Sequence, residues 1–136
     1  MNILRFLTPK SQVVYLYSDF TLRQAMEKME YHRYTAVPVI NRNGEYMDIL
    51  TEGDVLWSLK NTCNFDLRLA EQTPLSEVHR HSHKDPIGAD SDIEDLMSLA
   101  INQNFVPVID DTNVFIGIVT RKDIMQYCFK KLNEQK

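Results

Sequence analysis

Thr120 and Asp123 are the residues whose type and spacing are best suited to ligand chemistry. They follow the apolar run 115–119 and lead into the amphipathic segment 124–132, a pattern that predicts a buried strand, a tight turn and a helix start. A carboxylate accepts hydrogen bonds from two neighbouring hydroxyl groups at once, so Asp123 is suited to chelate a ribose diol. The Thr120 hydroxyl can reach the same sugar or a phosphate. The spacing is also that of an ordinary helix cap, and this alternative stays open.

The turn between these two residues is cationic. Arg121 and Lys122 occupy it. The first backbone N–H groups of a helix have no partner within the helix, so they favour a bound anion. The turn therefore predicts a site for a ligand that carries phosphate.

An earlier Thr-x-x-Asp pattern has the opposite charge. Thr51 and Asp54 follow the expected strand 46–50, and the turn between them is Glu52-Gly53, which has one anion and no cation. If both patterns form ligand sites, we expect the Asp123 site to take the more anionic ligand.

The two patterns belong to an internal duplication. A threonine, an aspartate and a proline of the first half each recur 69 residues later in the chain. Both copies of the proline lie in the tetrapeptide Val-Pro-Val-Ile. A repeat at a fixed offset indicates two copies of one structural unit. The matching pairs are Thr51 and Thr120, Asp54 and Asp123, and Pro38 and Pro107.

Each half predicts the order strand, helix, strand, strand, helix. Apolar residues spaced three and four apart give one helix face at Leu22, Ala25, Met26 and Met29, and again at Ile93, Leu96, Met97 and Ala100. The methionines are expected in the core. The expected strands are 13–17, 36–40, 46–50, 86–89, 105–109 and 114–119, and the other expected helices are 54–60 and 123–132.

The pattern predicts an α/β fold made of two β-α-β-β-α repeats. We expect repeat one at about 8–62, a linker at about 63–75 and repeat two at about 76–132, in a single module spanning 1–136. A single half of about 65 residues buries too little surface to be stable on its own. The two repeats are therefore expected to pack face to face around a pseudo-twofold axis.

The segments V-P-V-I-N-R-N-G-E-Y-M-D-I-L-T-E-G-D-V-L and F-V-P-V-I-D-D-T-N-V-F-I-G-I-V-T-R-K-D-I resemble the CBS domain. The pair resembles a Bateman module, in the form of a stand-alone bacterial-type CBS domain protein. The resemblance covers nearly the whole chain. It implies a regulatory, non-catalytic module that binds an adenosine ligand such as AMP, ADP, ATP or S-adenosylmethionine, has no cofactor, and forms a flat homodimer through helix faces.

The resemblance also assigns residues to the ligand clefts. Phe105 could stack on adenine or face the core, and Asp48, which stands where the second repeat has Gly117, is expected to narrow the second cleft. The first cleft is assigned Thr120, Asp123, Arg121, Lys122, Ile118, Thr35, Ala36, Tyr17, Asp19, Asn104 and Phe105, and the second cleft Thr51, Asp54, Ile49 and Ala89.

Composition argues against several other functions. The net charge of −4 gives no electrostatic footprint for nucleic acid, and no apolar run is long enough for a membrane span or a secretory signal. Cys63 and Cys128 lack metal-type spacing and are expected to be reduced thiols, which favours the cytoplasm. No nucleophile–base pair or glycine-rich phosphate loop points to an enzyme.

Two features leave alternatives open. His79, His81 and His83 alternate, so a strand would place them on one face as metal ligands, while the plainer interpretation is a solvated linker without a metal. Trp57 is expected to pack on a helix face or to form a dimer contact. The expected mechanism is a population shift in which the ligand clamps the two repeats and an unknown protein effector responds. The alternative function is a ligand-free interaction or dimerisation module.

Overall fold

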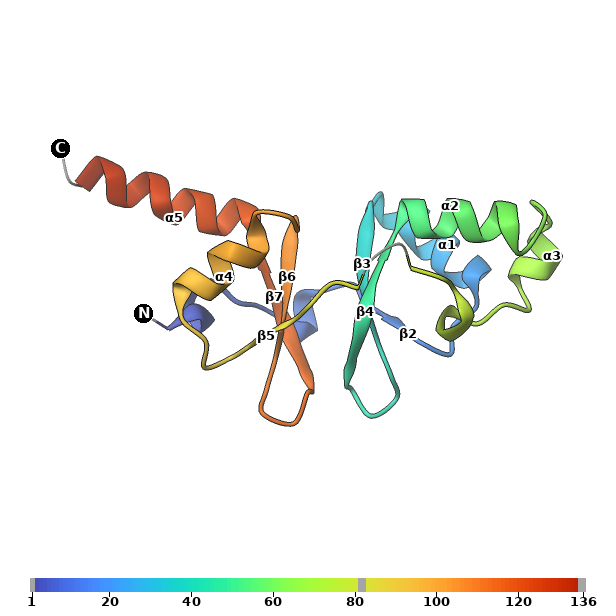
Figure 1. Cartoon of the computed structure of the whole chain (residues 1–136), viewed down its shortest axis with the longest axis horizontal. Coiled ribbons are helices and arrows are strands. Elements are labelled where there is room, and N and C mark those ends of the chain that lie inside the picture. Colours follow the sequence, from blue (N-terminus) through green and yellow to red (C-terminus); the bar gives the residue numbers. More distant parts are fainter. Residues whose placement is uncertain (1, 81–82, 135–136) are drawn as a thin grey trace. The chain divides into compact units, whose positions relative to one another are not determined.

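The computed structural model describes residues 2–80 and 83–134, which form two compact units (Figure 1). The first-repeat unit is Val14–Lys84, and the second-repeat unit combines Met1–Val13 with Asp85–Lys136. The N-terminal segment therefore belongs with the second repeat. No helix among the described residues is long and apolar enough to cross a membrane.

The first-repeat unit is a three-stranded sheet with helices packed on one face. The strand order is β2-β3-β4, with β2 parallel and β4 antiparallel to β3. Its elements are β2 (Leu16–Tyr17), α1 (Leu22–His32), β3 (Ala36–Ile40), β4 (Tyr46–Thr51), α2 (Glu52–Asn61), α3 (Leu67–Ala70) and the 3₁₀ turn η3 (Leu75–Glu77).

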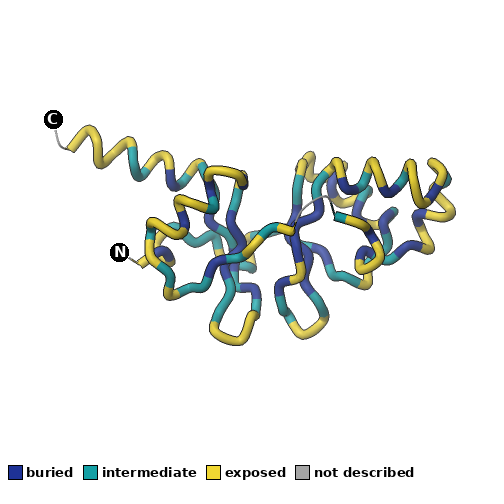
Figure 2. The backbone as a smooth tube through the Cα atoms, in the orientation of Figure 1, coloured by how far each residue is buried: buried dark blue, intermediate teal, exposed yellow. Residues whose placement is uncertain are grey.

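Alternation along the strands decides which sheet face is the core of this unit. Val37 pairs with Leu50, and both are buried against Leu22 and Ala25 of α1. Residues paired across antiparallel strands lie on the same face of the sheet, and neighbours along a strand lie on opposite faces. Ala36 and its partner Thr51 therefore lie on the sheet face away from α1. The strands are dark in Figure 2, where buried residues are blue, and much of α2 is exposed.

The second-repeat unit has the same plan with one more strand. Its sheet order is β1-β7-β6-β5, and Val106, Val108 and Val119 are buried against Leu96 of α4 and Ile124 of α5. Its elements are the 3₁₀ turns η1 (Ile3–Phe6) and η2 (Lys10–Gln12), β1 (Thr8–Pro9), β5 (Ile87–Gly88), α4 (Ile93–Ala100), β6 (Phe105–Ile109), β7 (Phe115–Thr120) and α5 (Arg121–Glu134).

The extra strand β1 depends on Gly117. Pro9 pairs with Gly117 at the edge of the sheet, and a Cβ atom at Gly117 would overlap the carbonyl oxygen of Thr8. Gly117 also has a φ of 155°, which side chains other than hydrogen rarely allow. The small residue at this position is therefore required by β1.

The predicted α/β fold and the order of elements in both repeats are confirmed. Several predicted bounds were wrong. The first strand of each repeat is shorter than expected, Leu16–Tyr17 instead of 13–17 and Ile87–Gly88 instead of 86–89. The second helix of each repeat begins directly after the threonine, at Glu52 instead of 54 and at Arg121 instead of 123. The structure also contains β1 and α3, which were not predicted because a two-residue edge strand and a one-turn helix carry no periodicity.

Candidate functional site

Thr120 and Asp123 meet where β7 ends and α5 begins. The Thr120 Oγ1 accepts a hydrogen bond from the backbone N–H of Asp123 at 3.2 Å, so the threonine caps the helix. The Asp123 side chain is half-buried. Among residues 2–80 and 83–134, no group donates a hydrogen bond to its carboxylate. Both acceptor oxygens are therefore available for a ligand.

Thr51 and Asp54 form a closed version of the same turn. Thr51 Oγ1 accepts from the Asp54 N–H at 3.1 Å, and the Asp54 carboxylate accepts from the Thr51 N–H at 3.1 Å. This reciprocal pair is a capping box, which satisfies two backbone donors at the start of α2. Asp54 is only 7% exposed. The carboxylate at this position is thus used by the fold.

Arg121 is engaged by the end of α4. Its guanidinium donates to the carbonyl oxygens of Ala100 at 2.8 Å and Ile101 at 3.3 Å, and to Asn104 Oδ1 at 3.1 Å. A cation at a helix C-terminus satisfies free carbonyl groups and stabilises the helix dipole. Lys122, the other cation of this turn, is exposed, and none of the described residues accepts a hydrogen bond from its ammonium group. Sequence reasoning assigned Arg121 only to the ligand and missed this structural role.

Several predicted residues of the second repeat share one face of the β6–β7 pair. Phe105 pairs with Thr120, and Ile118 pairs with Pro107, so these side chains lie on the face opposite the helices. Asn104 lies directly before β6, and its backbone carbonyl accepts a hydrogen bond from the Arg121 backbone N–H at 2.8 Å. An open hollow beside the turn is lined by Asn104, Thr120, Arg121, Lys122, Met125, Gln126 and Phe129. Asp123 is outside that hollow.

The predicted residues of the first repeat lie in the other unit. Ala36 pairs with Thr51, and the carbonyl of Thr35 accepts the first N–H of α2 at 2.9 Å. Ile49 is buried on the sheet face that carries Ala36. Ala89 follows β5 in the second-repeat unit and is half-buried there. The assignment of these residues to a ligand cleft stays a prediction.

Tyr17 and Asp19 form a cluster with Arg42, which was not predicted. Arg42 donates to both oxygens of Asp19, at 2.8 and 3.0 Å, and its guanidinium carbon lies 3.9 Å from the centre of the Tyr17 ring. The Arg42 hydrogen bond holds the pKa of Asp19 below its ordinary value. Asp19 is therefore a paired anion within its own unit.

Asp48 holds the segment that follows η3. Its carboxylate accepts from the Lys84 backbone N–H at 3.0 Å and lies 3.1 Å from His83 Nδ1. Arg80 approaches the same carboxylate at 4.0 Å and donates to the Val78 carbonyl. Asp48 thus binds its own chain, whereas the equivalent Gly117 accommodates β1. The expectation that Asp48 narrows the second cleft stays a prediction.

The histidine run does not assemble a metal site in the described part of the chain. No group of three His, Cys, Asp or Glu side chains there is arranged to hold a metal ion. His79 is exposed and His83 contacts Asp48, while His81 lies outside the described residues.

The chain belongs to the CBS domain family. The family model matches twice, at residues 5–61 and 75–130, which is most of the chain. Two CBS domains in tandem agree with the two units and their shared plan. The chain is also 21% identical over 140 residues to the uncharacterized protein MJ1225 of Methanocaldococcus jannaschii, covering 94% of this chain. It spans only 50% of the length of that relative.

Solved structures show the same fold. CbpB in complex with c-di-AMP is 23% identical with a TM-score of 0.87, over 98% of this chain and 88% of the other. CBSX2 in complex with AMP is 19% identical with a TM-score of 0.75, over 95% of this chain and 96% of the other. These similarities establish a tandem CBS fold, and the ligands are those of the two solved proteins.

Proposed function

We propose that this protein is a regulatory, non-catalytic module that binds an adenosine nucleotide at the Thr120–Asp123 turn. The observation that carries the proposal is the Asp123 carboxylate, which receives no hydrogen bond from the described residues and stands at the end of β7. A ribose presents two adjacent hydroxyl donors, which a free carboxylate accepts together. The c-di-AMP and AMP complexes of the similar CBS proteins support an adenine nucleotide as the ligand class.

The charges near the turn favour a phosphate-bearing ligand. Lys122 is exposed beside the first backbone N–H groups of α5, which attract an anion. Thr51 and Asp54 offer less, because their side chains are used in the capping box. The second-repeat turn is therefore the proposed binding turn, and the first-repeat turn is proposed to serve the fold.

Regulation would follow from differential binding. A nucleotide that binds one arrangement of the module better than another shifts the population toward it, with a coupling of about 1–3 kcal/mol. The proposed readers of this shift are a protein effector and a second copy of the chain. A ligand-free interaction module is the second candidate, and the exposed apolar residues of α4 and α5 favour it.

Thermal unfolding with added AMP, ADP, ATP, S-adenosylmethionine and c-di-AMP tests the proposal. A ligand at one hundred times its dissociation constant stabilises the folded state by about 2.7 kcal/mol. We expect one of the five to raise the melting temperature of the parent. The increase should disappear in Asp123→Asn and persist in Asp54→Asn, each compared with its own ligand-free curve. An unchanged response in Asp123→Asn would overturn the assignment, and no response to any ligand would favour the interaction module.

A further inference from the structure

The N-terminal arm, which we define as residues 2–13, contacts the chain on both sides of the Thr120–Asp123 turn. On one side, β1 pairs with β7 at Gly117 and Ile118, shortly before the turn. On the other side, η1 lies against Tyr127 of α5, about one helical turn beyond it. The arm therefore bridges the strand and the helix between which the turn is formed.

The contact with Tyr127 is made by two neighbouring side chains of η1. The rings of Phe6 and Tyr127 meet edge to face, with their centres 5.1 Å apart and their planes at 73°. The Arg5 guanidinium carbon lies 5.3 Å from the centre of the Tyr127 ring. Both geometries are attractive, because an aromatic ring has a negative face and a positive edge. Ile3, fully buried in the second-repeat core, anchors this part of the arm.

Helix α5 has few other anchors. Among residues Arg121–Glu134, each of them described, Ile124 alone is buried. Met97 of the neighbouring helix α4 was expected in the core, but it is 40% exposed in an open groove beside α5. A helix with one buried side chain is positioned by its partly buried contacts, and the contact between Tyr127 and the arm is of that kind.

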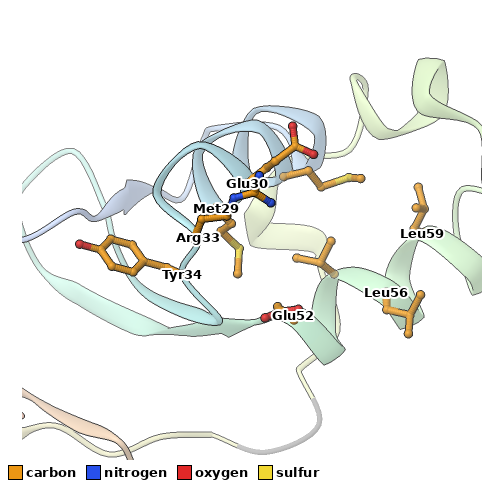
Figure 3. Close-up of a pocket in the computed structure, with 9 residues that line it drawn as sticks. Met29, Glu30, Arg33, Tyr34, Glu52, Leu56 and Leu59 are labelled. Carbon is orange, nitrogen blue, oxygen red and sulfur yellow. The ribbon is translucent and has the colours of Figure 1, made fainter. Parts of the chain in front are cut away.

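The equivalent helix of the first repeat is held by elements close to it in the sequence. The 69-residue offset relates Tyr127 to Ser58 of α2, which is buried and whose carbonyl accepts from the Cys63 N–H at 3.2 Å. Figure 3 shows α2 beside α1, where Leu56 and Leu59 line a groove whose other residues also come from the first repeat. Helix α5, in contrast, is also held by a segment more than one hundred residues away in the sequence.

The arm is easier to detach than the elements that it joins. Its strand β1 has only two residues, and Pro9 has no backbone N–H to donate to the ladder. Within the described arm, 2–13, Ile3 alone is buried. Segments with few buried contacts open at a lower free energy than the whole protein. The arm can therefore leave the sheet and α5 while the rest of the unit stays folded.

We propose that the N-terminal arm is a strap that holds the Thr120–Asp123 turn in its binding geometry, and that detachment of the arm weakens nucleotide binding. While the arm is attached, β7 and α5 keep a fixed relation, and the Asp123 N–H stays within reach of Thr120 Oγ1. Detachment leaves Ile124 as the buried anchor of α5, so the first turn of the helix loosens. The effect on binding rests on the proposed function, whereas the effect on the turn needs no ligand.

Amide hydrogen exchange of the ligand-free full chain, measured by NMR, tests the strap. Phe6→Leu keeps an apolar side chain and removes the edge-to-face contact with Tyr127. We expect the Asp123 amide to exchange about threefold to tenfold faster, the scale of a lost aromatic contact, while the amides of β6 keep their parent rates. Phe20→Leu is the matched control, because Phe20 is also half-buried and meets Tyr17 edge to face at 5.6 Å in the first-repeat unit. It should leave the Asp123 rate unchanged.

Other exchange patterns would overturn the strap. An unchanged Asp123 rate in Phe6→Leu would show that the arm does not position the turn. An equal rise for Asp123 and for the amides of β6 would show that Phe6 stabilises the whole unit without a particular effect on the turn. If Phe6→Leu fails to fold, the milder variant Arg5→Gln decides. It should raise the Asp123 rate about twofold, and an unchanged rate would count against the proposal.

Calorimetric titration with AMP and with c-di-AMP measures the effect on binding. We expect Phe6→Leu to raise the dissociation constant of the nucleotide that binds the parent by about threefold to tenfold, in line with the exchange rate of Asp123. Faster exchange with an unchanged dissociation constant would show that the strap does not control binding. If the parent binds neither nucleotide, the proposed function fails, and the exchange pattern alone decides whether the arm positions the turn.

Discussion

The two Thr-x-x-Asp turns share a sequence pattern and differ in how their side chains are used. In the first-repeat unit, Thr51 and Asp54 exchange two hydrogen bonds and the carboxylate is buried. In the second-repeat unit, Thr120 still caps the helix, but Asp123 keeps its carboxylate free of donors from the described residues. The threonine thus caps the helix in both copies of the motif, whereas the aspartate is part of the cap only in the first copy.

The residue directly after each threonine also differs between the two repeats. Glu52 places an anion at the start of α2, which agrees with that helix dipole, whereas Arg121 places a cation at the start of α5. Arg121 avoids this conflict by reaching the C-terminal carbonyls of α4. The duplication has diverged by giving equivalent positions different partners.

The largest expected effect is at Gly117. Gly117→Ala is expected to destabilise the folded state by about 3 kcal/mol, because the new Cβ would overlap β1 in an unfavourable backbone conformation. Gly53→Ala is the matched control, since its Cβ would meet only Thr51 Oγ1 at 3.7 Å. It should change stability by less than about 1 kcal/mol. Urea unfolding measures both, and equal losses would contradict the role assigned to β1.

Arg121 and Glu52 provide the next comparison. Arg121→Ala should cost about 2 kcal/mol, because the charged hydrogen bonds to Ala100 and Ile101 at the end of α4 are lost. Glu52→Ala should cost about 0.5 kcal/mol, the scale of an exposed helix-dipole interaction. Denaturant midpoints distinguish the two. A cost for Arg121→Ala no greater than for Glu52→Ala would show that the cap of α4 contributes little.

The two motif aspartates should separate stability from binding. Asp54→Ala is expected to cost about 1–2 kcal/mol through loss of the capping box. Asp123→Ala should cost less than about 0.5 kcal/mol, because its carboxylate receives no hydrogen bond from the described residues. Thermal unfolding without ligand tests this order. A larger loss for Asp123→Ala would mean that Asp123 is also used by the fold.

The smallest effect concerns the loops between paired strands. Asp110 accepts from Val114 N–H, from the Thr112 hydroxyl and from Thr112 N–H, and these bonds lower its pKa below 3.8. A lowered pKa stabilises the fold above 3.8, and this contribution is lost as the pH falls through the folded-state pKa. Asp110→Asn should therefore be less stable at neutral pH, and the difference should narrow in acid.

Asn41 occupies the equivalent place in the first repeat and provides the control. Its side-chain oxygen accepts from the N–H groups of Asn43 and Glu45, and its amide nitrogen donates to the Glu45 carboxylate at 2.9 Å. Asn41→Asp should therefore give a weaker acid-dependent contribution than Asp110 gives, because the new carboxylate would lie beside that of Glu45 and be repelled by it. Melting curves across the acid range measure both variants, and parallel curves for the parent and Asp110→Asn would exclude the effect.

Local patterns were sufficient to predict most elements. The apolar runs around Val-Pro-Val-Ile predicted β3 and β6 with their observed bounds, and the spacing of Leu22, Ala25 and Met29 predicted the apolar face of α1. The 69-residue offset predicted two equal repeats. These features depend on periods of two and 3.6 residues and on caps, which are properties of neighbouring residues.

Contacts between distant residues could not be predicted in the same way. Nothing in the pattern indicates that β1 needs Gly117, or that Asp48 binds Lys84 across 36 residues. The two motif aspartates also look alike in sequence, yet one is buried in a capping box and the other is half-buried with free acceptors. Their difference depends on which donors the tertiary structure brings near.

The sequence by itself determined the duplication, the α/β repeats and the two candidate turns, because each depends on residues close in the chain. The tertiary structure decided which of those turns leaves its carboxylate without a hydrogen-bond donor among the described residues, and where the Arg121 guanidinium is anchored. Hydrogen bonds and burial depend on distance in space, and only the folded chain sets that distance.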